Sequence, residues 1–239
     1  MTAVPLDTHL ERDSWLRPLA ERAGRDLEGA PAEEIIAWAA DEFAPRFALS
    51  TSMTDAVLVA IAAGVRPGLP ALFVDTGYHF AETLGTRDAI AASYPVEVLT
   101  LTPRQTVAEQ DATYGAHLHD RDPDLCCELR KVTPFNEALN GYDAWASGIR
   151  RDESLARRSM RVVEWDPRRA VVKVNPLAAW TQDDVDRYAA EHGVLVNPLV
   201  SEGYRSLGCA PCTRSVAPGA DPRSGRWAGT GKTECGLHG

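Results

Sequence analysis

The sequence predicts an α/β protein built on a parallel sheet that helices cover on both faces. From residue 47 onward, short apolar runs typical of buried strands alternate with stretches of helical spacing. The runs Phe47–Ser50 and Ala71–Val74 each end in a polar turn, and a helical stretch follows each turn. This alternation is the pattern of a parallel sheet whose strands are buried on both sides.

The same spacing rules give the remaining elements. Thr181 and Asp184 form a capping box that opens a helix, and Gly193 ends it. An arginine-rich stretch, 150–161, separates the last two strand candidates. The further strand candidates are Val96–Leu101, Asp143–Ile149 and Val171–Val174, and the further helical stretches are 55–63, a stretch ending at Ser93, and 103–114.

Three regions are expected along the 239 residues. Residues 1–44 are rich in helix formers and predict a helical segment before the sheet. Residues 45–212 hold the strand candidates and predict the α/β domain. Residues 213–239 begin with a stretch rich in Gly, Pro and Ser, so we expect a mobile C-terminal tail that meets an anion. The charges of residues 213–233 are Arg214, Arg223, Arg226 and Lys232 against Asp221.

Charge and hydropathy limit the functional classes. Lys and Arg number 25 against 34 Asp and Glu, and the formal charge of -9 opposes non-specific attraction to nucleic acid. The apolar run Ala56–Val65 is half of the ~20 residues that a membrane-spanning helix needs. The first residues contain no apolar signal core. We therefore expect a soluble, cytoplasmic protein.

Five cysteines occur as two close pairs and a single residue, which argues against a disulfide framework. Cys126–Cys127 and Cys209/Cys212 predict a site with four thiolate ligands. Neighbouring residues on a regular helix point ~100° apart, so tandem ligands need a broad target, and a four-iron cluster is broad enough. A four-cysteine zinc site that only stabilises the fold remains the alternative.

Two polar turns follow strand candidates, at the sheet edge where open parallel sheets bind ligands. Ser50–Asp55 leads into a helix, and hydroxyls and amides at a helix N-terminus suit a phosphate. Asp75–Gly77 follows the next strand. We expect the two turns to form a nucleotide crevice, although helix capping and turn chemistry would also explain these residue types.

Positive charge gathers at Arg130–Lys131, at Arg150–Arg151 with Arg157 and Arg158, and at Arg223 and Arg226. Such residues often form a solvated face. Because several follow strand ends or lie close to cysteines in the sequence, they also predict a site for phosphate or sulfate.

Cys235 stands alone in a short polar segment near the end of the chain. Lys232 and nearby arginines would favour its thiolate, and His238 could support the anion. An inert cysteine and a free terminal histidine are the simpler interpretations.

Taken together, these motifs resemble the assimilatory adenylylsulfate reductases, the cluster-containing branch of the sulfonucleotide reductases, from about Phe47 to His238. The resemblance implies an adenine-nucleotide α-hydrolase (Rossmann-like) fold, a [4Fe-4S] cluster on Cys126, Cys127, Cys209 and Cys212, and a nucleophilic Cys235. The motifs are Val74–Phe80, Cys126–Lys131, Gly148–Arg151, Lys173–Leu177, Gly208–Thr213 and Glu234–His238.

One motif departs from the wider superfamily of nucleotide-binding proteins. That superfamily has a Ser-Gly-Gly-x-Asp-Ser type of phosphate loop, whereas this chain has Ser50-Thr51-Ser52-Met53-Thr54-Asp55. Glycines that allow the backbone to approach a pyrophosphate are missing. This weakens an ATP-cleaving function and suits a nucleotide with a single phosphate.

The resemblance implies reduction of adenylylsulfate to sulfite and AMP through an S-sulfocysteine on Cys235, with thioredoxin as the dithiol partner. Rival functions are reduction of the 3'-phosphorylated substrate, whose reductases generally lack the paired cysteines; ATP-dependent tRNA thiolation; and a non-catalytic zinc module. The expected substrate-binding residues are Ser50, Ser52, Thr76, Gly77, Lys131, Gly148, Arg150, Arg151, Arg157, Arg223, Arg226 and His238.

Overall fold

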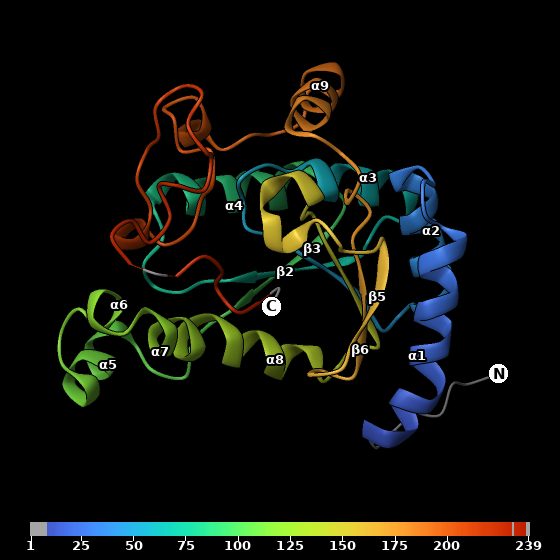
Figure 1. Cartoon of the computed structure of the whole chain (residues 1–239), viewed down its shortest axis with the longest axis horizontal. Coiled ribbons are helices and arrows are strands. Elements are labelled where there is room, and N and C mark those ends of the chain that lie inside the picture. The colour runs from blue at the N-terminus through green and yellow to red at the C-terminus, as the bar shows by residue number, and fades with distance from the viewer. Residues whose placement is uncertain (1–8, 231, 238–239) are drawn as a thin grey trace.

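The computed structural model describes residues 9–230 and 232–237, in which one six-stranded sheet lies between helices (Figure 1). In this described part of the chain, no helix is both long and apolar enough to cross a bilayer. The strands are β1 (Phe47–Ser50), β2 (Pro70–Val74), β3 (Glu97–Leu101), β4 (Ala144–Ser147), β5 (Val163–Asp166) and β6 (Val171–Val174). The helices are α1 (His9–Asp26), α2 (Ala32–Phe43), α3 (Val57–Val65), α4 (Ala81–Ser93), α5 (Val107–Tyr114), α6 (Leu118–Arg121), α7 (Pro123–Cys127), α8 (Thr133–Leu139) and α9 (Gln182–His192).

The strand order is β3-β2-β1-β4-β6-β5. Neighbouring strands pair in parallel from β3 to β6, which confirms the predicted parallel sheet. Strand β5 is antiparallel to β6, and the sequence analysis did not predict it. With four residues directly after an arginine-rich stretch, β5 carries too weak an apolar pattern to be recognised, and its hairpin partner β6 stabilises it at the sheet edge.

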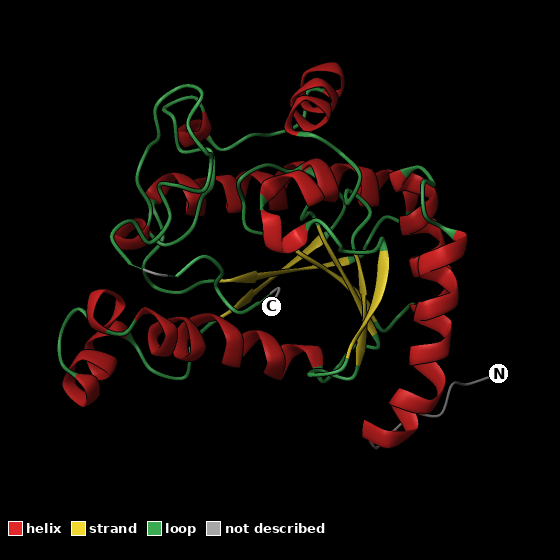
Figure 2. Cartoon of the chain, in the orientation of Figure 1, coloured by secondary structure: helices red, strands yellow, loops and turns green. Residues whose placement is uncertain are grey.

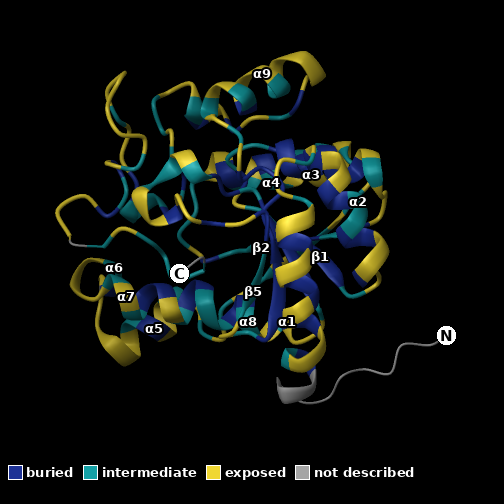
Figure 3. Cartoon of the chain, turned by 45° about the vertical axis from the view of Figure 1, so that its right-hand side comes forward, coloured by how far each residue is buried: buried dark blue, intermediate teal, exposed yellow. Residues whose placement is uncertain are grey.

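Helices cover both faces of the sheet, as the buried strands require (Figure 2). On one face, Phe47 and Leu49 belong to a core shared with α1, α2 and α3. On the other face, Ala48 and Trp145 pack with Phe135 of α8, and the Phe135 and Trp145 ring centroids lie 4.9 Å apart. Side chains alternate between the two faces because a strand has a period of two residues. Figure 3 shows the resulting buried layer at β1 and β2.

Strand β1 lies between β2 and β4, so the chain leaves it in one direction and later returns on its other side. Loops that leave such neighbours at their carboxyl ends diverge and open a crevice. The predicted helices before the sheet are present as α1 and α2, and the Thr181–Asp184 capping box opens α9, which ends at Gly193.

Helix α1 is fixed to the sheet by a shared carboxylate. Asp143, which precedes β4, accepts hydrogen bonds from Arg12 of α1 and from Arg46, whose Nε lies 2.8 Å away. Burial raises the pKa of Asp143, but the hydrogen bonds from Arg46 and Arg12 outweigh it, so that the pKa falls below its usual value. The ionised form is therefore stabilised by folding.

We expect Asp143→Asn to lower the free energy of unfolding by about 2 kcal/mol at pH 7. Because the folded state lowers this pKa, the contribution is present above the unfolded pKa of about 4 and is lost as the pH falls below it. Urea denaturation followed by circular dichroism at pH 7 and at lower pH measures both effects. The control is Asp41→Asn, which removes a surface ion pair with Arg66; an equal loss in both variants would contradict the assignment.

Candidate active site

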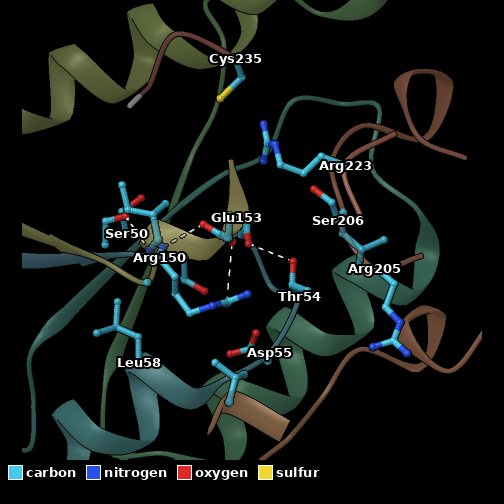
Figure 4. Close-up of a pocket in the computed structure, with 18 of the residues that line it drawn as sticks. Ser50, Thr54, Asp55, Leu58, Arg150, Glu153, Arg205, Ser206, Arg223 and Cys235 are labelled. Atoms are coloured by element: carbon cyan, nitrogen blue, oxygen red, sulfur yellow. Dashed lines mark hydrogen bonds and ion pairs between the residues drawn. The ribbon is translucent and has the colours of Figure 1, made fainter. Parts of the chain in front are cut away.

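A cavity of about 230 Å³ opens where β1 and β4 end. The loops after these two strands form one side of it, and the segment from Arg205 to Cys235 crosses its other side. In Figure 4, Cys235 lies at one end of this cavity, and Asp55 and Leu58 lie at the other. The expected residues Ser50, Ser52, Lys131, Gly148, Arg150, Arg157, Arg223 and Arg226, together with Cys235, all line the cavity.

The loop after β1 makes a sharp turn without glycine. Met53 is fully buried and takes a φ of 59°, a left-handed conformation that few non-glycine residues adopt. The Asn197 side chain holds this turn by donating from Nδ2 to the Met53 carbonyl at 3.1 Å. Asp55 then accepts from the Val57 amide, at the first residue of α3, at 3.0 Å, and burial raises its pKa. The loop therefore both holds the start of α3 and lines the cavity.

The cavity has an apolar wall at the end where Leu58 lies. Its other members are Leu177, Val185, Ala189 and Val196. Apolar walls with a few polar groups are typical of sites for small organic ligands such as a nucleoside. Asp55 and Asp186 are the acids at this wall.

Two cations, the buried Lys131 and the partly buried Arg226, also line the cavity. Burial lowers the pKa of Lys131, but the thiols of Cys209, Cys235 and Cys127 outweigh this effect and raise it. Arg226 packs 4.4 Å above the Trp227 ring and donates to the Leu207 carbonyl at 2.8 Å. Gly208 makes this close packing possible, because a Cβ there would lie 2.4 Å from the guanidinium. Both side chains can meet an anion in the cavity.

Three other cavity arginines, Arg150, Arg157 and Arg223, pair with carboxylates. Arg150 lies 3.1 Å from Asp152 and also contacts Glu153, while Arg157 bridges Glu153 and Glu234. Arg223 reaches Glu234 at 3.1 Å.

Three expected substrate-binding residues are not part of this cavity wall. Thr76 lies beside the cysteines, with its hydroxyl 3.3 Å from the Cys209 sulfur. Gly77 leaves space for Arg130, since a Cβ there would lie 3.0 Å from that guanidinium. Arg151 turns away and bonds Glu28 at 2.8 Å and the Met160 carbonyl at 2.7 Å. A fourth expected residue, His238, lies outside the described residues.

The four paired cysteines line a second cavity. Cys126 and Cys127 end α7, a π-helical turn over Glu128–Val132 follows, and α8 continues the same helical run. Arg130 and Lys131 stand four positions after the two cysteines, and all four residues are buried. Residues four apart share a helix face, so each cysteine has a cation beside it. Cys209 and Cys212 approach from the Gly208–Thr213 segment.

Burial and mutual repulsion raise the pKa of Cys126 to about 12 and that of Cys212 to about 11. Among the described residues, His117, His119 and Asp120 are the group whose possible metal-ligand atoms all lie within 4.8 Å of one another. No three of the cysteine sulfurs come this close together. A tetrahedral zinc ion, with Zn–S bonds of about 2.3 Å, would hold its sulfurs roughly 3.8 Å apart. In this structure the four sulfurs are therefore not gathered as closely as the ligands of one zinc ion.

Comparison with known proteins decides the family. Residues 44–215 match the phosphoadenosine phosphosulfate reductase domain. The chain belongs to the phosphoadenosine phosphosulfate reductase family. This confirms the resemblance to sulfonucleotide reductases inferred from the motifs.

Several relatives within the sulfonucleotide reductases are named adenosine 5'-phosphosulfate reductase. The Streptomyces coelicolor protein is 60% identical over 239 residues and matches 100% of both chains. The Mycolicibacterium smegmatis protein is 55% identical over 238 residues, covering 100% of this chain and 99% of its own.

Solved structures support the fold of a sulfonucleotide reductase. A phosphoadenylyl-sulfate reductase from Candida auris, solved as a phosphate complex, matches with a TM-score of 0.70 and 26% identity over 82% of this chain and 96% of its own. Candida glabrata FMN adenylyltransferase shares only the fold, with a TM-score of 0.56 and 14% identity over 90% of this chain and 70% of its own. The expected adenine-nucleotide α-hydrolase-like architecture is confirmed.

The cavity of this reductase also contains polar residues that were not among the expected substrate-binding residues, including His79, Glu153 and Glu234. His79 Nε2 lies 2.9 Å from the Val74 carbonyl, while its buried Nδ1 has no hydrogen-bond partner among the described residues. Burial lowers the pKa of His79, so this ring is neutral near pH 7 and can offer Nδ1 as an acceptor. Its position just after a strand end was the available signal.

We expect Arg226→Gln to weaken binding of inorganic phosphate about tenfold, because a charge-assisted hydrogen bond in a buried site is lost. Isothermal titration calorimetry measures the dissociation constant. Arg66→Gln is the control, since Arg66 pairs with exposed Asp41 on the surface. Equal phosphate affinities for all three proteins would show that Arg226 does not meet the anion.

Proposed function

We propose that this sulfonucleotide reductase is an adenosine 5'-phosphosulfate reductase that reduces adenylylsulfate to sulfite and AMP in sulfate assimilation. One observation carries the proposal: Cys235, from the C-terminal segment, lines the same cavity as Lys131, Arg226 and the loops after β1 and β4. A nucleophile, two cations and an apolar wall therefore share one space. The full-length relatives of that name support this activity.

The shape of the cavity gives the substrate one orientation. The adenosine group occupies the apolar end near Leu58 and Val185, and the phosphosulfate group extends toward Lys131 and Arg226. This orientation brings the sulfate sulfur to Cys235, at the end of the cavity away from Leu58 (Figure 4). The glycine-free loop after β1 serves a nucleotide with a single phosphate.

In the first step, the Cys235 thiolate attacks the sulfur of the phosphosulfate. An S–S bond forms, the bond from sulfur to the bridging oxygen breaks, and AMP leaves with the electron pair. Negative charge on the thiolate and on the substrate would oppose this approach in water. Lys131 and Arg226 offset that repulsion because they are fixed in a buried site before the reaction begins.

In the second step, a dithiol protein, which we take to be thioredoxin, attacks the Cys235 sulfur. The S–S bond of the S-sulfocysteine breaks and sulfite leaves with the electron pair. The second thiol of the partner then resolves the mixed disulfide, so the dithiol supplies both electrons. The cytoplasm suits this chemistry because it keeps these thiols reduced.

The four paired cysteines fit a [4Fe-4S] cluster. Their sulfurs are spread more widely than one zinc ion requires, and Arg130, Lys131 and Arg226 provide positive charge next to them. Cys126, Cys127, Cys209 and Cys212 would hold the cluster. When bound, it supplies a fixed centre of negative charge that holds the cysteine segments and Lys131 in place near the substrate.

Two observations favour adenylylsulfate over its 3'-phosphorylated form. The paired cysteines are present, and the relatives of 55–60% identity are named for adenosine 5'-phosphosulfate.

Single-turnover mass spectrometry tests the proposed reaction. Mixed with adenylylsulfate and no reductant, the protein should gain one sulfonate on Cys235, release one AMP per site and then stop. Reduced thioredoxin should then release sulfite and restore the thiol. Cys235→Ser should bind AMP normally yet complete neither step; sulfite formation by this variant at the normal rate would refute the covalent mechanism.

Iron and sulfide analysis of anaerobically purified protein tests the cofactor. Replacing Cys126, Cys127, Cys209 or Cys212 by Ser should lower iron content and activity together, because each removes one ligand of a closed site. Cys235→Ser is the matched control and should keep its iron and its brown colour. A colourless zinc protein, or iron loss on replacing Cys235 alone, would overturn this division of the cysteines.

A further inference from the structure

The residue before the nucleophile, Glu234, occupies part of the cationic end of the cavity. Arg157 donates to its carboxylate through Nε at 3.1 Å and through Nη2 at 2.8 Å, which is a two-point contact. Arg223 Nη2 approaches the same carboxylate at 3.1 Å from the other side. Two arginines of the expected substrate-binding set therefore hold the protein's own acid.

These contacts lie in a partly desolvated place. The side chain of Arg157 is 9% exposed and that of Glu234 is 19% exposed. Arg157 is also held by Glu153, whose carboxylate accepts from the Arg150 backbone amide at 2.9 Å. Two-point pairs of arginine and carboxylate with this burial are stronger and more rigid than ordinary surface ion pairs.

Further contacts hold the backbone on both sides of Cys235. Arg223 donates to the Thr233 carbonyl at 2.7 Å, and Arg169 donates to the Gly236 carbonyl at 3.3 Å. Leu237 packs against the apolar cluster that contains Trp145. The Glu234 contacts thus belong to a set of interactions that holds this segment with the Cys235 side chain facing the cavity (Figure 4).

Two further cations of the cavity, Lys131 and Arg226, differ from this group. Among the ion pairs of the described residues, none involves Lys131 or Arg226. Their charges are available to an incoming anion, whereas those of Arg157 and Arg223 are already compensated by Glu153 and Glu234.

We propose that Glu234 is a positioning residue. Held by Arg157 and Arg223, it places Cys235 next to the sulfate sulfur of the bound substrate, while Lys131 and Arg226 bind the phosphosulfate group. The proposal deepens the proposed function and rests on it only for the effect on the reaction. Its structural part concerns the substrate-free protein: the ion pairs of Glu234 with Arg157 and Arg223, which we call the latch, hold the C-terminal segment in place.

Alkylation of Cys235 by iodoacetamide measures the latch without any substrate. Peptide mapping by mass spectrometry reads the rate at Cys235 alone. We expect Glu234→Gln to raise this rate about tenfold, because the contacts that hold the segment are lost. Glu42→Gln, on the exposed side of α2, removes the same charge elsewhere and should change nothing. An unchanged rate in Glu234→Gln would overturn the latch.

Binding of AMP and single-turnover sulfonation test the division of roles. Glu234→Gln should leave the AMP dissociation constant within twofold and slow sulfonation of Cys235 about tenfold. Because both substitutions break the same contact, the double variant Glu234→Gln/Arg157→Gln should sulfonate no more slowly than the slower single variant. Iron content and melting temperature confirm that each variant is folded.

Different results would identify the error. Tighter AMP binding in Glu234→Gln with weaker binding in Arg157→Gln would show that Arg157 serves the substrate, with Glu234 as its competitor. Additive losses of sulfonation rate would show that Glu234 and Arg157 act separately. In a third outcome, alkylation behaves as expected while adenylylsulfate sulfonates neither the variants nor the unsubstituted protein. That result would support the Glu234 latch and refute the proposed function.

Discussion

Two cations lie between the cysteine cavity and the cavity that holds Cys235. Lys131 and Arg226 line both spaces. A charge withdrawn from water needs compensation, and here the thiols on one side and an incoming anion on the other can provide it. The local structure follows from this need: the helical run of α7, the π-helical turn and α8 carries Lys131 inward, and Gly208 leaves the backbone bare where Arg226 crosses it.

The sequence was most informative where one local pattern determines the structure. Apolar runs bounded by polar turns predicted the parallel strands, and the Thr181–Asp184 capping box predicted the start of α9. Strand β5 was not predictable in this way, because its short segment is held by pairing with β6 rather than by its own pattern. The cysteine pairs were recognisable from spacing, but the π-helical turn that follows them was not.

Which polar residues reach the cavity depends on contacts between distant segments. Arg150 and Arg151 are neighbours of the same type, yet Arg150 is in an extended conformation, so the two side chains point in different directions. Arg150 lines the cavity, whereas Arg151 reaches Glu28 near the end of α1. Thr76 and Gly77 follow β2, one strand away from the β1–β4 crevice, and face the cysteines and Arg130 instead. No local sequence pattern predicts the directions in which these side chains point.

The Cys235 thiol has to react first with the substrate in the cavity and then with a dithiol protein. The segment that carries it is long enough to reach both. The Trp227 amide donates to the Cys212 carbonyl at 3.0 Å and its side chain is buried, so the segment is fixed to the cysteine site at that point. Beyond Trp227, Cys235 is held by the ion pairs of Glu234 and by the backbone contacts of Thr233 and Gly236. Eight residues that extend by about 3.3 Å each reach up to roughly 26 Å. Release of the Glu234 contacts and of the Lys232–Asp124 ion pair could therefore carry Cys235 to a protein partner, while the cysteine cavity and the cations Lys131 and Arg226 stay in place.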